Sequence, residues 1–115
     1  MNILSTHVLD ATSGTPATGI EVILSSGGTE LARATTDDDG RITEFPGPPI
    51  ESGTYTLTFA TGEYFARRQT ETFYPEVVIT FRIPGQRPDA APDGKRKFHV
   101  PLLLSPYSYS TYRGS

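Results

Sequence analysis

Short apolar runs along this chain alternate with clusters of glycine, proline and aspartate. This spacing is typical of β-strands joined by turns in an all-β sandwich. In the clearest run, Tyr55, Leu57 and Phe59 share one face while threonines occupy the other, as a half-buried strand requires. The pattern predicts strands over residues 3–9, 19–25, 30–36, 41–45, 54–60, 77–83, 98–104 and 107–112.

Two segments depart from the strand pattern. Residues 62–69 contain helix formers and no β-branched residue, so they predict one short helix with Thr61 as its N-cap. Residues 84–97 are rich in proline, glycine and charge, which predicts a long and mobile loop. The expected fold is therefore a β-sandwich with a single short helix.

The last two predicted strands carry an unusual outer face. If the apolar positions of residues 98–104 face the core, His99 points outward beside Leu103. The final strand adds Tyr107, Tyr109 and Tyr112. An outward apolar and aromatic surface predicts a subunit interface, and the alternative is that both faces are covered within one chain.

Composition narrows the function classes. The length of 115 residues predicts one domain over residues 1–115, and the net charge of −3 provides no basic field for nucleic acid. No apolar run is long enough to span a membrane, and no signal peptide is evident at the start, so we expect a cytoplasmic protein. The absence of cysteine excludes disulfides, thiolate nucleophiles and thiolate-bound zinc.

The candidate chemistry rests on two histidines, His7 and His99, both within predicted strands. Imidazole titrates near neutral pH and is the natural general base for activating water. The alternative is that both are structural histidines. A histidine zinc site is not supported, since H-x-H and H-E-x-x-H spacings are absent. The acidic turn at residues 37–40 does not fit an EF-hand, because that frame places Thr35 first and Pro46 twelfth.

Motifs along the whole chain nevertheless resemble one family. The segments Phe98-His99-Val100-Pro101-Leu102-Leu103-Leu104-Ser105-Pro106 and Tyr109-Ser110-Thr111-Tyr112-Arg113-Gly114-Ser115 are similar to the closing signature of 5-hydroxyisourate hydrolases of the transthyretin-like family. Leu4-Ser5-Thr6-His7-Val8-Leu9-Asp10 resembles the opening motif of that family, and Thr36-Asp37-Asp38-Asp39-Gly40-Arg41 resembles its T-x-x-D-G-R turn. Further matches are Gly14-Thr15-Pro16-Ala17, Tyr64-Phe65 and Phe73-Tyr74-Pro75-Glu76-Val77.

The resemblance implies a transthyretin-like (prealbumin-like) sandwich of two four-stranded sheets with a short helix. It implies a homotetramer, a dimer of dimers, with active sites where dimers meet, and hydrolysis of 5-hydroxyisourate in urate degradation without metal or cofactor. The implied catalytic residues are His7, Arg41, His99 and Ser115, where Ser115 acts through its hydroxyl or carboxylate. Arg41, Tyr112, Arg113 and Gly114 are the implied substrate-binding residues.

Two departures from the family pattern concern the rim of the implied site. Lys97-Phe98-His99 stands where the family often has His-Tyr-His, and the loop over residues 84–97 is longer than usual. The sequence leaves open which histidine is the base. The competing functions are a transthyretin-like carrier that binds a small ligand without turnover and a structural or adhesive sandwich module. The pairing of both histidines with Arg41 and the tail favours the enzyme.

Overall fold

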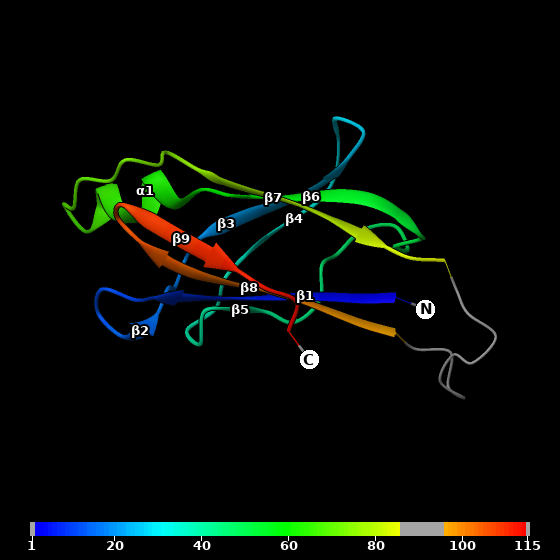
Figure 1. Cartoon of the computed structure of the whole chain (residues 1–115), viewed down its shortest axis with the longest axis horizontal. Helices are drawn as coiled ribbons and strands as arrows, with labels where there is room; N and C mark the ends of the chain where they lie inside the picture. The colour runs from blue at the N-terminus through cyan, green and yellow to red at the C-terminus, as the bar shows by residue number, and fades with distance from the viewer. Residues whose placement is uncertain (1, 86–95, 115) are drawn as a thin grey trace.

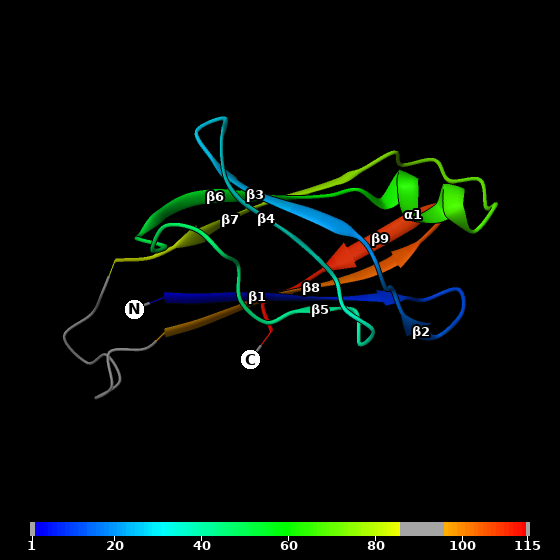
Figure 2. The same cartoon turned by 180° about the vertical axis from the view of Figure 1, so that it is seen from behind.

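A computed structural model describes residues 2–85 and 96–114 as two β-sheets that face each other, with one helix at an end of the sandwich (Figure 1). The rear view shows the same two layers, with the helix again at the end of the sandwich where β8 turns into β9 (Figure 2). The strands are β1 (Asn2–Asp10), β2 (Thr15–Pro16), β3 (Glu21–Ser26), β4 (Thr29–Thr35), β5 (Arg41–Ile42), β6 (Gly53–Phe59), β7 (Val77–Ile83), β8 (Arg96–Ser105) and β9 (Ser108–Thr111), and the helix is α1 (Thr61–Arg67).

The first sheet joins the two ends of the chain. Its order is β2-β1-β8-β9, with the two-residue strand β5 also paired to β1. Strands β1 and β8 run parallel over their whole length, and the other pairs in this sheet are antiparallel. The second sheet has the order β4-β3-β6-β7. The β1–β8 pairing is what brings the N-terminal and C-terminal motifs side by side.

The hydrophobic core lies between the sheets and follows the predicted alternation. Tyr55, Leu57 and Phe59 of β6 are buried, as are the four apolar residues that alternate along β8. The outward positions of β8 are therefore those of His99 and Leu103, as predicted. The buried apolar residues of β1, β3, β7 and β8 that complete this layer are Leu4, Val8, Val22, Leu24, Val77, Ile79, Ile83, Phe98, Val100, Leu102 and Leu104.

A buried carboxylate fixes helix α1 to the end of β1. Asp10 is 2% exposed and accepts a hydrogen bond of 2.8 Å from the Tyr64 hydroxyl. Its other oxygen accepts the backbone N–H of Thr12 at 2.9 Å, which closes the turn after β1. Burial, followed by the hydrogen bond to Asp10, raises the pKa of Tyr64 to about 12, so its hydroxyl stays a donor. This contact fixes the end of the strand that carries His7.

Several predicted boundaries need correction. The helix begins at Thr61 itself, and its N-cap is Ala60 with no side-chain hydrogen bond, so the predicted Thr61 cap is wrong. The strand expected over 41–45 is only β5, and β8 begins at Arg96, inside the predicted loop. Residues 86–95 of that loop lie outside the described part of the chain. The implied pair of four-stranded sheets is a five-stranded and a four-stranded sheet, because β2 and β5 both add to β1.

Candidate functional site

A tight turn places Arg41 against the outer face of β1. The Asp37 carboxylate accepts the backbone N–H groups of Asp39 and Arg41, both at 2.9 Å. Gly40 has a φ of 73°, and a Cβ there would lie 2.5 Å from the carbonyl oxygen of Val8. Only glycine combines this left-handed backbone with so close an approach. The sequence of this turn therefore fixes the backbone position from which the Arg41 side chain extends.

His7 and Arg41 are direct partners in the antiparallel β1–β5 pair. Directly opposed residues place their Cβ atoms about 5 Å apart on one face of a sheet. The neighbours of His7 along β1, Thr6 and Val8, are buried in the core, so His7 lies on the outer face and is half-buried. A histidine and an arginine are thus fixed side by side at the surface.

His99 lies on the same outer face, one strand away. Its partner in the parallel β1–β8 pair is Ser5, and the Ser5 hydroxyl lies 2.8 Å from His99 Nδ1. Burial, then the nearby charges of His7 and Arg41, lower the pKa of His99 from its ordinary value, and a smaller opposing effect comes from the backbone of Ser5. The ring is therefore a neutral imidazole at neutral pH, which is the form that can accept a proton.

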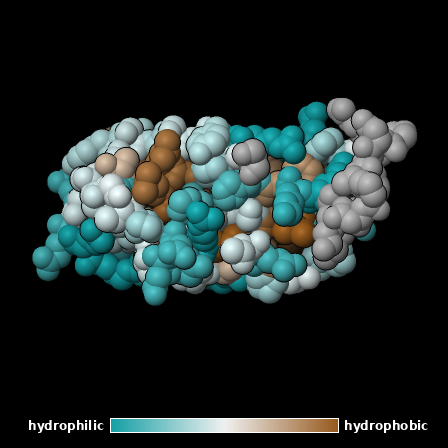
Figure 3. Space-filling view, turned by 90° about the horizontal axis from the view of Figure 1, so that it is seen from below, coloured by the Kyte–Doolittle hydropathy of each residue, from teal (hydrophilic) through white to brown (hydrophobic). Residues whose placement is uncertain are grey.

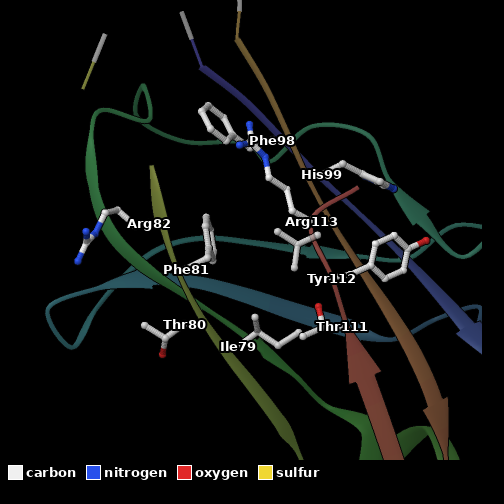
Figure 4. A pocket seen from close by; sticks show the side chains of 10 residues that line it. Ile79, Thr80, Phe81, Arg82, Phe98, His99, Thr111, Tyr112 and Arg113 are labelled. Atoms are coloured by element: carbon white, nitrogen blue, oxygen red, sulfur yellow. The ribbon is translucent and has the colours of Figure 1, made fainter. Parts of the chain in front are cut away.

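The C-terminal tail packs on His99. After β9, the backbone N–H of Gly114 donates to the His99 carbonyl at 2.9 Å. Figure 4 shows Tyr112 on the same side of β8 as His99, whereas Arg113 lies on the side of Phe98. The Arg113 guanidinium stands 5.1 Å from the centre of the Phe98 ring, within cation–π range. Alternation along the tail thus sends Tyr112 and Gly114 towards the histidine.

Two pockets meet at His99. The first has a volume of about 320 Å³ and lies over β1, β5 and β8. The second, of about 260 Å³, lies between the tail and β7 and is shown in Figure 4. Among the described residues that line the first pocket, Arg41 and Lys97 are positively charged and none carries a carboxylate, so this lining is cationic in a chain of net charge −3. Its lining residues are Ile3, Ser5, Thr6, Arg41, Ile42, Thr43, Lys97 and His99.

The outer face around the first pocket also exposes apolar side chains. Leu103 is 37% exposed and Tyr112 is 59% exposed. Tyr109 is also exposed, but it is the strand partner of the buried Leu104 and packs on Tyr74, so it lies on the opposite face of the sheet. Figure 3 views the molecule from the side of β1 and β5 and shows hydrophobic surface in separate places with polar surface between them. The sequence prediction of an outward apolar and aromatic surface is confirmed for Leu103 and Tyr112 and is wrong for Tyr109. Its role as a subunit interface stays a prediction.

The predicted site residues are only partly brought together. His99 and Arg41 line the first pocket, and His7 stands beside it as the strand partner of Arg41. Tyr112 and Arg113 line the second pocket, and Gly114 packs on the His99 ring. Ser115 lies outside the described residues. Ser5 was not predicted, although its place two residues before His7 puts it on the same strand face.

The described residues also show whether metal-binding side chains cluster and whether a helix could span a membrane. Residues 2–85 and 96–114 hold no group of three histidine, aspartate or glutamate side chains arranged to bind a metal ion. The expectation of a metal-free and cofactor-free reaction stays a prediction. No helix in the same residues is long and apolar enough to cross a membrane.

Comparison with known proteins gives consistent matches over the whole chain. Residues 4–114 match the HIUase/Transthyretin family. The chain is 44% identical to the 5-hydroxyisourate hydrolase of Salmonella typhimurium over 119 residues, which cover 99% of this chain and 82% of that protein. The structure of Klebsiella pneumoniae 5-hydroxyisourate hydrolase superposes with a TM-score of 0.84 at 42% identity, covering 98% and 99% of the two chains. Transthyretin from Sparus aurata superposes with a TM-score of 0.81 at 29% identity, covering 96% and 95%.

Proposed function

Because the chain belongs to the HIUase/transthyretin family, we propose that its cationic pocket is where 5-hydroxyisourate is bound and hydrolysed. The activity itself follows from the relatives: the chain is a hydrolase that acts on 5-hydroxyisourate, a compound of urate degradation. The two-sheet fold is shared with transthyretin, which shows that the fold alone does not choose between hydrolysis and ligand carriage. The residues of the pocket are therefore the basis for proposing that hydrolysis takes place there.

One observation supports the location of this reaction more than any other. Two histidines and an arginine from three strands converge on one outer face, and a pocket of about 320 Å³ opens between His99 and Arg41. A neutral imidazole beside a guanidinium combines a proton acceptor with a group that binds oxygen anions. Hydrolysis of a cyclic amide needs both at the same carbonyl.

The proposed reaction begins with water held between the imidazole and the substrate. A neutral histidine takes one proton from water as the oxygen forms a bond to a ring carbonyl carbon of 5-hydroxyisourate. Arg41 stabilises the negative charge that develops on the carbonyl oxygen. The carbon–nitrogen bond of the six-membered ring then breaks, and the imidazolium returns its proton to the departing nitrogen. The product is 2-oxo-4-hydroxy-4-carboxy-5-ureidoimidazoline.

The tail has supporting roles in this proposal. Tyr112 shapes the groove on the side of His99 and excludes bulky apolar ligands. Gly114 lets the backbone pass close to the imidazole. Arg113 and Ser115 were expected to contact substrate or water, and these roles remain part of the proposal. The cation–π contact of Arg113 with Phe98 supports an additional role for it in holding the tail on β8.

We further propose that residues 1–115 form one domain that assembles as a homotetramer, a dimer of dimers, in the cytoplasm. The exposed Leu103 and Tyr112 support assembly through the outer face that carries the pocket. A shallow pocket on one sheet becomes an enclosed groove when a second copy covers it. Exclusion of bulk water strengthens the electrostatic contacts within such a groove.

The direct test generates 5-hydroxyisourate in situ from urate with urate oxidase and follows its ultraviolet decay. We expect decay much faster than the spontaneous rate when the protein is present, and no loss of rate with a chelator. Analytical ultracentrifugation of the same sample measures its mass, for which we expect that of a tetramer. Decay at the spontaneous rate from a folded tetramer would instead favour a small-molecule carrier.

The pH dependence of this reaction should reflect the lowered pKa of His99. A lowered pKa means that the ring loses its proton at a lower pH, so the base is available further into the acidic range. We expect the acidic limb of kcat/KM to have its midpoint below pH 6.5, the ordinary histidine value. The measurement is kcat/KM against pH, corrected for spontaneous decay, beside an NMR titration of His99. An acidic limb at or above the ordinary value would contradict a base in this environment.

A further inference from the structure

The two edges of the His99 ring have different neighbours. On one edge, Nδ1 lies 2.8 Å from the Ser5 hydroxyl of the adjacent parallel strand. On the other edge, a Cβ built on Gly114 would lie 2.5 Å from Cδ2, so the tail backbone covers that edge closely. Because Nδ1 and Cδ2 are both bonded to Cγ, the free end of the ring is the one that carries Cε1 and Nε2. Nε2 is therefore the nitrogen that remains for substrate or water.

A neutral imidazole carries one proton, and its position decides what Nε2 can do. If the proton is on Nε2, that nitrogen is a donor and cannot act as a base. If the proton is on Nδ1, Nε2 presents a lone pair. Isolated neutral histidine prefers the proton on Nε2, so a protein that uses Nε2 as a base needs a partner for Nδ1–H. Ser5 provides an acceptor oxygen at that position.

The charges that face His99 favour the same arrangement. His7 on β1 and Arg41 on β5 both act on the ring electrostatically, and Lys97 of β8 lines the same pocket. A cation stabilises the tautomer that turns its lone pair towards it. Since the described lining of the pocket contains the cations Arg41 and Lys97 and no carboxylate, a lone pair on the pocket side of the ring is the favoured arrangement.

We propose that Ser5 is a positioning residue that accepts the Nδ1–H of His99, leaves Nε2 unprotonated and so makes His99 the general base. The inference rests on the proposed function and deepens it by choosing between the two histidines. In the reaction, a water O–H bond breaks, its proton goes to Nε2 and its oxygen joins the carbonyl carbon. Throughout, Nδ1–H keeps its hydrogen bond to Ser5, which stabilises the imidazolium. The proton then moves from Nε2 to the departing ring nitrogen.

The tautomer can be measured without turnover. In protein labelled with ¹⁵N-histidine at mildly alkaline pH, long-range ¹H–¹⁵N correlations distinguish a proton on Nδ1 from one on Nε2. The chain has only two histidines, so a His7→Gln variant assigns the signals. We expect His99 to carry its proton on Nδ1, and to shift towards the Nε2–H form in Ser5→Ala. An Nε2–H tautomer in the unmodified protein would overturn the proposal, as would an unchanged tautomer in Ser5→Ala.

Kinetics provide the second measurement. Ser5→Ala should lower kcat roughly 5- to 10-fold with a much smaller change in KM, the size expected when one hydrogen bond is lost and both tautomers become accessible. Ser5→Thr keeps the hydroxyl and should restore kcat and the Nδ1–H tautomer together. An unchanged kcat in Ser5→Ala would overturn the positioning role. A chain that holds the Nδ1–H tautomer but does not accelerate 5-hydroxyisourate decay would contradict the proposed function and leave the tautomer assignment intact.

Discussion

Replacing His99 with alanine should lower kcat for 5-hydroxyisourate by about two orders of magnitude or more, since a positioned general base contributes roughly 10²–10⁴-fold. His99 lines the cationic pocket, and its Nδ1 is hydrogen-bonded to the Ser5 hydroxyl. Burial and the nearby charges of His7 and Arg41 lower its pKa. Removing His99 leaves no other neutral imidazole in the lining of that pocket. The measurement is the ultraviolet decay of enzymatically generated substrate at saturating concentration.

The comparison with His7 makes this experiment decisive. His7→Ala should cost less than His99→Ala, because His7 lies beside the pocket and is the strand partner of Arg41. His99→Gln is a matched variant that keeps a planar polar side chain of similar size but cannot take a proton at this pH. It should be as slow as His99→Ala, with an unchanged thermal midpoint. Near-normal rates for both His99→Ala and His7→Ala would remove histidine base catalysis from the mechanism.

Gly114→Ala should reduce kcat by about 10- to 100-fold while leaving the fold intact. A Cβ at this position would stand 2.5 Å from Cδ2 of His99 and 3.2 Å from Cγ of Pro101, so the imidazole or the tail must move. A displacement of about 1 Å in a catalytic group can cost a factor of roughly 10². The expected signature is a lower kcat together with shifted NMR signals of His99.

Gly85→Ala is the matched control for this variant. No heavy atom of residues 2–84 or 96–114 lies within 4 Å of a Cβ built on Gly85, and its backbone does not need glycine. The control should keep both the activity and the thermal midpoint of the unmodified chain. Full activity in Gly114→Ala would show that close packing of the tail at Gly114 does not hold the His99 ring in its catalytic position.

The alternation of apolar residues predicted most of the sandwich correctly. Strands such as β6 and β8 are long enough for a period of two to appear in the sequence, and their buried faces agree with it. β2 was missed because a two-residue strand that contains Pro16 has no period to detect. The N-cap assigned to Thr61 failed because Thr61 is the first residue of the helix and is completely buried.

The sequence provided candidate residues for the site but not their geometry. His7, Arg41 and His99 were identified from residue type and family resemblance, and the structure places them on one face. No local pattern reveals that β1 pairs in parallel with β8, so the contact between Ser5 and His99 could not be foreseen. A serine on a strand is also too common to attract attention, and only the register of the two strands makes it notable.

The parallel pairing of β1 with β8 also bears on when the enzyme becomes competent as it folds. Ser5 and His99 are 94 positions apart in the sequence, so their contact closes a loop that includes most of the chain. Closing such a loop is costly in entropy, and contacts of this sequence separation form slowly. During synthesis, β1 cannot pair with its main partner until β8 has emerged from the ribosome. The antiparallel β3–β4 hairpin can form early in folding. The return of hydrolysis during refolding therefore reports when the two ends of the chain pair.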